Sequence, residues 1–394
     1  MNEHRTTREL FGATERSPIY MDHHATTPVD PRVLEVAIRM MVDDFGNANG
    51  IENTHGEKAA HAVSRAKAQV ASVVSAESDD VHFTSGSTEA IQLAIAQAIA
   101  VRPRPLRVAM TRVEHKAVID TVLRAEQMGL VQKVWISVDD KARLDWADFE
   151  RALSQGLDLV CVMAANNEVG TIYPIQRVAK ASHHHGATLL VDATQAVGRM
   201  AFADGDHIID YIALSGHKIY GVKGVGALVA PKFDRSAVYG LHGAHSPTPN
   251  VAGIAAMGRA CEIMELEGRA ESVRLEQLRD RLQERLLVKV PDLAINGDEE
   301  NRLPHNLNFS APGAPNDMVL GRLRGKLSAS TGSACNAGAQ EPSHVLRAMG
   351  LSEALLDSCI RIGLGRSTET DDVDMAASLI ADAVHDVRAN ISRS

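Results

Sequence analysis

The sequence predicts an α/β protein in which helices cover both faces of a mostly parallel sheet. From residue 80 onward, short apolar runs alternate with helical stretches, and this alternation is typical of such a sheet. The chain has 394 residues, which is enough for two domains with a sizeable core. Ligands of such sheets bind at the carboxyl ends of the strands. We therefore look for function where the predicted strands end.

The N-terminal part supplies the predicted sheet. Residues 1–18 are expected to form a loose arm, and a short strand from Ile19 precedes a helix that begins at Pro31. Further helices are expected over Glu57–Val74 and Ala90–Ala100. The predicted strands are Val81–Thr84, Arg107–Met110, Lys133–Val138, Leu157–Ala164, Ala187–Asp192, Ile208–Leu214 and Gly226–Ala230. Residues 19–250 are expected to form one large domain.

The pattern changes after Pro249, and we expect a smaller α+β domain over residues 251–394. A helix over Val251–Glu267 is predicted to lead into a second helix, whose leucines recur at helical spacing. These leucines are Leu275, Leu278, Leu282 and Leu286. Later elements are predicted as strands near Leu293–Ile295 and Asn306–Phe309 and as helices near Asp317–Leu323 and Asp371–Val387.

Composition excludes several classes of protein. The formal net charge is −9 and aromatic residues make up 4%, so neither a basic nucleic-acid surface nor a row of stacking aromatics is expected. No apolar run reaches the length of a membrane span, and the first residues lack the apolar core of a signal peptide. We therefore expect a cytoplasmic protein without a membrane partner.

The cysteines and a histidine run have mostly structural interpretations. Cys161, Cys261 and Cys359 lie in apolar or helical patterns and are expected to be buried thiols, not disulfides. Cys335 lies in a small, polar stretch and is considered below. The run His183–His185 is expected to be a solvated helix end, because consecutive side chains on a helix point in different directions and make a poor metal site.

Lys218 is the first candidate for chemistry. It follows the apolar run Tyr211–Leu214 in the stretch Ser215-Gly216-His217-Lys218. An unprotonated lysine amine is a nucleophile, and pyridoxal phosphate (PLP) bonds to such an amine. The alternative is a surface lysine in a glycine-rich turn.

Other polar residues also follow predicted strands. Ser85–Thr88 precedes a helix, so its amides and hydroxyls suit a phosphate, although an ordinary helix cap explains them equally well. Asp192 could pair with a protonated pyridine nitrogen, and Gln195 offers an amide near it. An amide of Asn166–Asn167 could donate to a phenolate oxygen, and His115 could stack on a ring or move protons. Together with Lys218, these residues form the set that a PLP site needs.

The chain resembles the cysteine desulfurases of the nitrogen-fixation and iron–sulfur-cluster type, which are class V aminotransferases and fold-type I PLP enzymes. The resemblance runs from about Ile19 to about Arg388, and it rests on the shared order and spacing of short motifs. These motifs are Tyr20–Asp22 with Ala25–Pro28, Phe83–Glu89, Glu114–Val118, Asn166–Gly170, Val191–Gln195, Ser215–Lys218, Pro304–Asn308, Ser330–Cys335, Glu341–Leu346 and Arg361–Arg366. It implies a mostly parallel seven-stranded sheet, a homodimer and the cofactor PLP.

The resemblance also implies a role for each site residue. Lys218 binds the cofactor and later moves protons, and Arg361 clamps the carboxylate of the substrate L-cysteine, because its planar fork fits a carboxylate bidentately. Arg366 is a second candidate for that role, although a structural ion pair is the preferred interpretation. The remaining roles are a pyridine partner (Asp192), phenolate partners (Gln195 and Asn167), a stacking ring (His115) and phosphate ligands (Ser87, Thr88, Ser215 and His217).

Cys335 is the sulfur acceptor that the resemblance implies. Its thiolate would take the sulfur of L-cysteine as a persulfide, leave L-alanine as the product and pass the sulfur to an acceptor protein. The alternative is a small residue in a tight turn. Whether Cys335 also binds a cluster or a metal directly stays open.

The chain departs from the family pattern near positions 240–250. The arginines usual there are absent, and Thr248 is the candidate for the threonine that reaches the neighbouring subunit's phosphate. The sequence given ends at Ser394, and we expect the longer tail that docks a scaffold protein in relatives to be missing. Iron–sulfur assembly, tRNA thiolation and DNA sulfur modification therefore stay open as pathways. Another class V lyase, such as a selenocysteine lyase, and an inactive desulfurase-like scaffold are the alternative functions.

Overall fold

The central feature of the fold is a sheet of seven strands in the order β2-β8-β7-β6-β5-β3-β4. A computed structural model describes residues 18–102, 104–202, 209–234, 238, 248–331 and 343–393. The strands of the sheet are β2 (Val81–Thr84), β3 (Leu106–Thr111), β4 (Val131–Ile136), β5 (Leu159–Met163), β6 (Thr188–Asp192), β7 (Tyr211–Ser215) and β8 (Gly226–Val229). Within this sheet, β8 is antiparallel to both neighbours and the other pairs are parallel. The prediction of a mostly parallel sheet with seven strands is confirmed.

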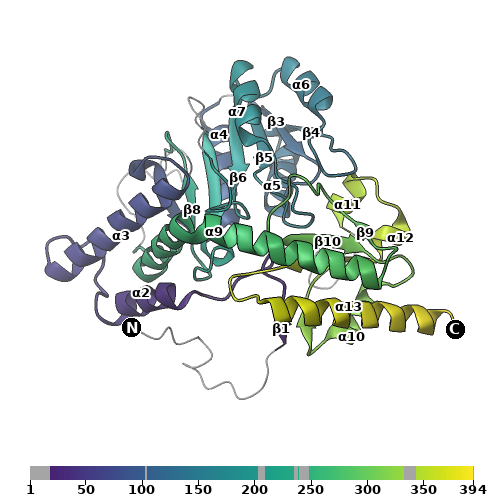
Figure 1. The fold of residues 1–394 in the computed structure, drawn as a ribbon. Coiled ribbons are helices and arrows are strands. Elements are labelled where there is room, and N and C mark those ends of the chain that lie inside the picture. Colours follow the sequence, from purple (N-terminus) through teal and green to yellow (C-terminus); the bar gives the residue numbers. More distant parts are fainter. Residues whose placement is uncertain are drawn as a thin grey trace.

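Helices cover both faces of this sheet, because its strands are apolar on both sides. Alternate residues of one strand face opposite ways, so Leu190 packs in one hydrophobic cluster and its neighbours Leu189 and Val191 in another. The first cluster includes residues of α4 (Ser87–Ala100) and α5 (Lys116–Gln127). The second cluster includes residues of α3 (Thr54–Val73), α6 (Trp146–Ser154), α7 (Ile175–His184) and the first part of α9 (Val251–Lys289). Figure 1 shows these layers.

The C-terminal residues build a second, smaller sheet. Its antiparallel strands lie in the order β12-β10-β9, and two further strands, β1 and β11, form a parallel pair. The elements concerned are β1 (Ile19–Tyr20), β9 (Ala294–Ile295), β10 (Asn306–Ser310), β11 (Leu327–Ser328), β12 (Cys359–Gly363), α10 (Asn316–Leu323), α11 (His344–Ala348), α12 (Glu353–Leu356) and α13 (Thr370–Ile391). Met21 packs in the core of this part of the chain. The domain boundaries at residues 18 and 250 stay predictions.

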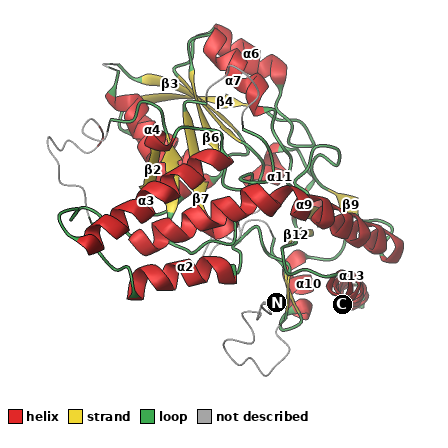
Figure 2. Ribbon diagram, turned by 60° about the vertical axis from the view of Figure 1, so that its left-hand side comes forward, coloured by secondary structure: helices red, strands yellow, loops and turns green. Residues whose placement is uncertain are grey.

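One long helix, α9, joins the two parts. The sequence predicts two successive helices here, and this prediction is wrong, because α9 continues for 39 residues through Gly268. A Cβ atom at Gly268 would lie 2.2 Å from the carbonyl oxygen of Gly198, so this glycine allows a close approach and does not end the helix. Figures 1 and 2 show α9 running beside α3 and α2 (Pro31–Val42) at one end, and beside α13 at the other.

The histidine run, Cys161 and Cys261 lie where the sequence predicts, whereas Cys359, expected in a helical pattern, lies in strand β12. His184 ends α7, and Nε2 of His183 lies 2.8 Å from a carboxylate oxygen of Asp210. Cys161, Cys261 and Cys359 are buried free thiols, and burial raises the pKa of Cys261 and Cys359 to about 12. No helix in the described part of the chain is long and apolar enough to span a membrane.

Candidate active site

The predicted phosphate-binding residues meet where strands β2 and β7 end. Gly226 of β8 is the register partner of both Thr84 and Ser215, so these two strand ends lie on either side of it. A Cβ atom at Gly86 would lie 4.0 Å from Oγ of Ser215. Helix α4 begins directly after Gly86, with Ser87 and Thr88, and no side chain caps its first amides. An uncapped helix N-terminus beside a hydroxyl group suits a phosphate.

Lys218 lies in a turn that is hydrogen-bonded to the N-terminal segment 22–27. The turn, η2 (Gly216–Lys218), follows β7 directly, and Nζ of Lys218 donates to the carbonyl oxygens of His24 and Ala25, the latter at 2.8 Å. The carbonyl oxygen of His217 accepts hydrogen bonds from the amide and the hydroxyl of Thr27, both at 2.9 Å. Burial lowers the pKa of His217 to about 4, so its ring is neutral at pH 7.

Asp192 and Glu114 place two carboxyl groups at the same edge of the sheet. Asp192 ends β6, and its Oδ1 accepts from the amide of Thr194 at 3.0 Å and from its hydroxyl at 2.5 Å. Glu114 is completely buried, and its Oε1 accepts from Oγ1 of Thr111 at 2.7 Å and from the amide of Met163 at 3.1 Å. Burial, with a smaller contribution from the charge of Asp192, raises the pKa of Glu114 to about 8. With this pKa, the Glu114 side chain is mostly protonated and uncharged at pH 7.

His115 and Asn167 follow the neighbouring strands β3 and β5. His115 caps α5, and its Nδ1 accepts from the amide of Ala117 at 3.1 Å. Asn166 connects the two strand ends, because its Nδ2 donates to the carbonyl oxygen of Val113 at 3.1 Å. Asn166 also orders the turn that presents Asn167, since its Oδ1 accepts from the amides of Glu168 and Val169.

Arg361 reaches this edge from the smaller sheet. It lies in the middle of β12, is buried, and donates from Nη1 to the carbonyl oxygen of Asn167 at 2.9 Å. Its amide also donates to the carbonyl oxygen of Ser330 at 2.7 Å. The large sheet and the small sheet thus contribute to one group of polar residues.

Cys335 and Thr248 are the two remaining predicted site residues. Cys335 lies within residues 332–342, outside the described residues, as does most of the atypical 240–250 segment. The flanking residue Ser343 is buried, and its hydroxyl donates to Oε2 of Glu168 at 2.5 Å. Thr248 is exposed and lies just before α9.

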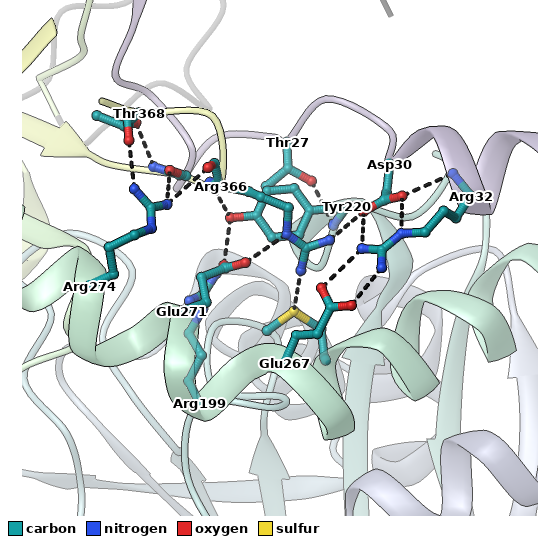
Figure 3. A network of polar contacts seen from close by, with 12 residues as sticks. Thr27, Asp30, Arg32, Arg199, Tyr220, Glu267, Glu271, Arg274, Arg366 and Thr368 are labelled. Atoms are coloured by element: carbon teal, nitrogen blue, oxygen red, sulfur yellow. Dashed lines mark hydrogen bonds and ion pairs between the residues drawn. The ribbon is translucent and has the colours of Figure 1, made fainter. Parts of the chain in front are cut away.

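Arg366 is part of a structural network, as the preferred interpretation of the sequence holds. Its guanidinium pairs with Asp30 and with Glu271, the latter at 2.7 Å, and lies 4.2 Å from the centre of the Tyr220 ring (Figure 3). The hydroxyl of Tyr220 donates to Glu271 at 2.9 Å. The two carboxylates that pair with Arg366 belong to the protein itself. Arg366 therefore connects the N-terminal segment, α9 and the C-terminal part.

The sequence reasoning missed two residues of the site, His24 and Asn306. His24 is buried against Gln195, with Nδ1 of His24 lying 3.2 Å from Oε1 of Gln195. Asn306 donates to Nε2 of His24 at 3.1 Å. The sequence offers only two consecutive histidines between Asp22 and Ala25, shortly after a strand, and nothing in this stretch indicates which residues His24 contacts.

The group of residues fits PLP. The helix N-terminus and the hydroxyl of Ser215 suit its phosphate, the buried carboxylate of Asp192 suits its pyridine nitrogen, and the amine of Lys218 lies in the turn after β7. These features, on a sheet with this strand order, define a fold-type I PLP enzyme.

Comparisons with known proteins agree with this class. The aminotransferase class-V family matches residues 19–375. A cysteine desulfurase IscS from Anaeromyxobacter sp. (strain Fw109-5) is 38% identical over 379 residues, which cover 94% of this chain and 93% of the relative. A solved NifS-like protein has a TM-score of 0.83 at 29% identity, covering 93% of this chain and 99% of that one. The structure of SspA in complex with cysteine has a TM-score of 0.76 at 28% identity, covering 88% and 98%.

The chain therefore belongs to the class-V aminotransferase family and, within it, to the cysteine desulfurases, which use PLP.

Proposed function

We propose that this enzyme converts L-cysteine to L-alanine and transfers the sulfur to Cys335 as a persulfide. The observation that carries the proposal is the buried guanidinium of Arg361, which the small sheet delivers beside Asn167 at the edge that holds Lys218 and Asp192. A relative of this fold is described in complex with cysteine, which supports the choice of substrate.

PLP, when bound, withdraws electrons from the α-carbon of an amino acid, so that a bond to that carbon or its neighbour can break. The chain's residues hold and orient it. Lys218 would bind it and then carry a proton, and Asp192 would keep a proton on the pyridine nitrogen. We assign the phosphate to Ser87, Thr88, Ser215 and His217 with Thr248 of a neighbouring subunit, the phenolate oxygen to Gln195 and Asn167, and the ring face to His115.

Arg361 and Cys335 would act on the substrate itself. Arg361 would bind the carboxylate of L-cysteine through charge-assisted hydrogen bonds. The thiolate of Cys335 would form a bond to the substrate sulfur as the carbon–sulfur bond breaks, and the electron pair left on carbon would take a proton to give L-alanine.

We also propose that the enzyme is a homodimer. Large apolar side chains at the end of α2 and in the loop after it are exposed, and grouped apolar surface of this kind marks protein interfaces. These residues are Ile38, Met41, Val42, Phe45 and Ile51. A second copy covering them would agree with the role assigned to Thr248. The acceptor protein that receives the sulfur, its pathway and the cytoplasmic location stay predictions.

The test is the release of sulfide and alanine from L-cysteine in the presence of PLP and a reductant. We expect wild type and the buried-thiol control Cys261→Ala to release both in equal amounts, and Cys335→Ala to release neither. Wild-type release by Cys335→Ala would show that another group accepts the sulfur. Release from selenocysteine alone would favour a selenocysteine lyase.

A second measurement separates an enzyme from an inactive scaffold. The pure protein should show a visible PLP absorption band that Lys218→Ala abolishes and that Lys223→Ala, at an exposed lysine five residues along, retains. If the protein shows no such absorption band even after PLP is added, the inactive scaffold is favoured.

A further inference from the structure

His24 is the centre of a buried chain of polar contacts that ends at the proposed cofactor site. Its ring stacks on the ring of His305, with 4.3 Å between the two centres, and its side chain is shielded from solvent. Burial, with smaller effects from Arg361 and Lys218, holds the pKa of His24 well below its ordinary value. The ring is therefore neutral, with one nitrogen that donates and one that accepts.

The amide of Asn306 decides which nitrogen accepts. Nδ2 of Asn306 donates to the backbone carbonyl oxygen of Glu168 at 3.1 Å. This carbonyl can only accept, so the NH₂ group of Asn306, and not its oxygen, must face it. The second hydrogen of that NH₂ group points at Nε2 of His24, which lies 3.1 Å away. Nε2 must then accept, and the proton of His24 belongs on Nδ1.

The proton on Nδ1 in turn orients Gln195. Nδ1 donates to Oε1 of Gln195 at 3.2 Å, and Nε2 of Gln195 donates to the backbone carbonyl oxygen of His24 at 3.1 Å. If the side-chain amide of Gln195 were reversed, both contacts would fail. Its NH₂ group would face the N–H of His24, and its oxygen would face the carbonyl oxygen of His24. One hydrogen on Nε2 of Gln195 has no partner among the described residues.

We propose that His24 is a positioning residue that makes Gln195 present an N–H group, and not its oxygen, to the phenolate oxygen of PLP. The inference rests on the proposed function, which assigns Gln195 to that oxygen. A hydrogen bond to an oxygen favours its proton-poor form. His24 thereby sets the pH at which the visible absorption band of the bound cofactor changes.

The test is a pH titration of this band in the PLP-loaded enzyme. His24→Leu removes the donor, and we expect the midpoint to rise by about half to one pH unit, the shift that one neutral hydrogen bond produces. Gln195→Leu should give a shift in the same direction, and the double variant should shift no further than Gln195→Leu alone. His24→Asn should keep the wild-type midpoint, because the Asn nitrogen is two bonds from Cβ, as Nδ1 is.

Each alternative result has a separate meaning. An unchanged midpoint in His24→Leu, a shift that persists in the Gln195→Leu background, or an equal shift in His24→Asn would overturn the role of His24. If His24→Leu does not fold, His24→Gln replaces it, because its amide reaches the position of Nε2 and leaves Oε1 of Gln195 without a donor. A band that is absent from wild type would contradict the proposed function, and the role of His24 with it.

Discussion

Arg361 and Asp22 form an ion pair between a buried guanidinium and a partly buried carboxylate, in which Nη2 of Arg361 lies 2.9 Å from Oδ1 of Asp22. The same carboxylate oxygen accepts from the hydroxyl of Ser330 at 3.1 Å. A buried guanidinium needs such partners, because an uncompensated charge in the protein interior is strongly destabilising. Asp22 and the carbonyl oxygen of Asn167 together fix the plane of the guanidinium, and this plane sets the direction from which a substrate carboxylate can be bound.

Arg361→Lys should raise KM for L-cysteine by about tenfold or more, because a lysine keeps the charge but cannot form two parallel hydrogen bonds. The visible PLP band should remain. Arg366→Lys is the matched control, since Arg366 is paired with Asp30 and Glu271, and it should lower the melting temperature while leaving KM unchanged. Steady-state kinetics of both variants check this, and an unchanged KM in Arg361→Lys would remove Arg361 from the substrate site.

Glu114→Gln should change how stability depends on pH. The folded protein holds a proton on Glu114 up to about pH 8, whereas the unfolded chain releases it near its ordinary pKa of 4.5. The loss of folding stability that comes from burying the Glu114 carboxyl is therefore absent below pH 4.5 and grows as the pH rises toward 8. Glu114→Gln stays neutral, so it should become more stable than wild type by a few kcal/mol between pH 5 and 8.

Denaturant unfolding of the loaded enzyme at several pH values measures this difference. Glu35→Gln, at an exposed position on α2, is the control and should show no such trend. A difference between Glu114→Gln and wild type that stays constant from pH 5 to 8 would mean that Glu114 is ionised in the folded protein.

Arg366→Met should destabilise the protein by about 2–4 kcal/mol at neutral pH, because it leaves two buried carboxylates with weaker partners. Burial opposes ionisation of Asp30, but the hydrogen bonds and charge of Arg32, with the charge of Arg366, outweigh it and lower the pKa of Asp30 to about 2. The stability that this carboxylate contributes is present above its unfolded pKa and is lost as the pH falls toward 2. The difference in unfolding free energy between Arg366→Met and wild type should therefore become smaller at acidic pH.

Unfolding in urea at pH 7 and pH 3 tests this behaviour. Arg322→Met is the control, because Arg322 and Asp386 form an exposed pair at 3.8 Å that should contribute less than about 1 kcal/mol. Equal effects of the two variants would show that the network in Figure 3 adds nothing to stability.

Gly268→Ala should lower the melting temperature, although alanine favours helix formation. Its Cβ atom would lie 2.2 Å from the carbonyl oxygen of Gly198, and such overpacking costs about 1–3 kcal/mol. Gly321→Ala is the matched control, since Gly321 lies in α10 and a Cβ atom there would meet nothing within 4 Å. It should stabilise the protein by about 0.5–1 kcal/mol. Calorimetry of the two variants checks the opposite signs.

Much of the fold follows from local patterns in the sequence, and the strands show why. β5 and β6 are continuous apolar runs bounded by polar residues, so their positions and their parallel arrangement could be predicted. The length of α9 could not, because Gly268 looks like a helix end in the sequence. Only its contact with Gly198, which is distant in the chain, explains why a glycine stands there.

Only part of the candidate site could be predicted from local patterns in the sequence. Lys218 and Asp192 stand at strand ends, where a local pattern marks them. Asp22 and His24 act through partners more than 150 residues away, Arg361 and Gln195, and no local pattern indicates such contacts. The tautomer of His24 depends on Asn306, which comes from β10, so it follows only from the folded structure.

The unbroken course of α9 has a consequence for how the molecule unfolds. Its first part, including Met257 and Met264, packs in the core against the large sheet, and its later leucines, such as Leu278 and Leu282, pack in the core of the small sheet. Unfolding of either core would remove the packing contacts of one end of α9. Heating should therefore give one cooperative transition, with equal calorimetric and van't Hoff enthalpies, in place of two separate ones.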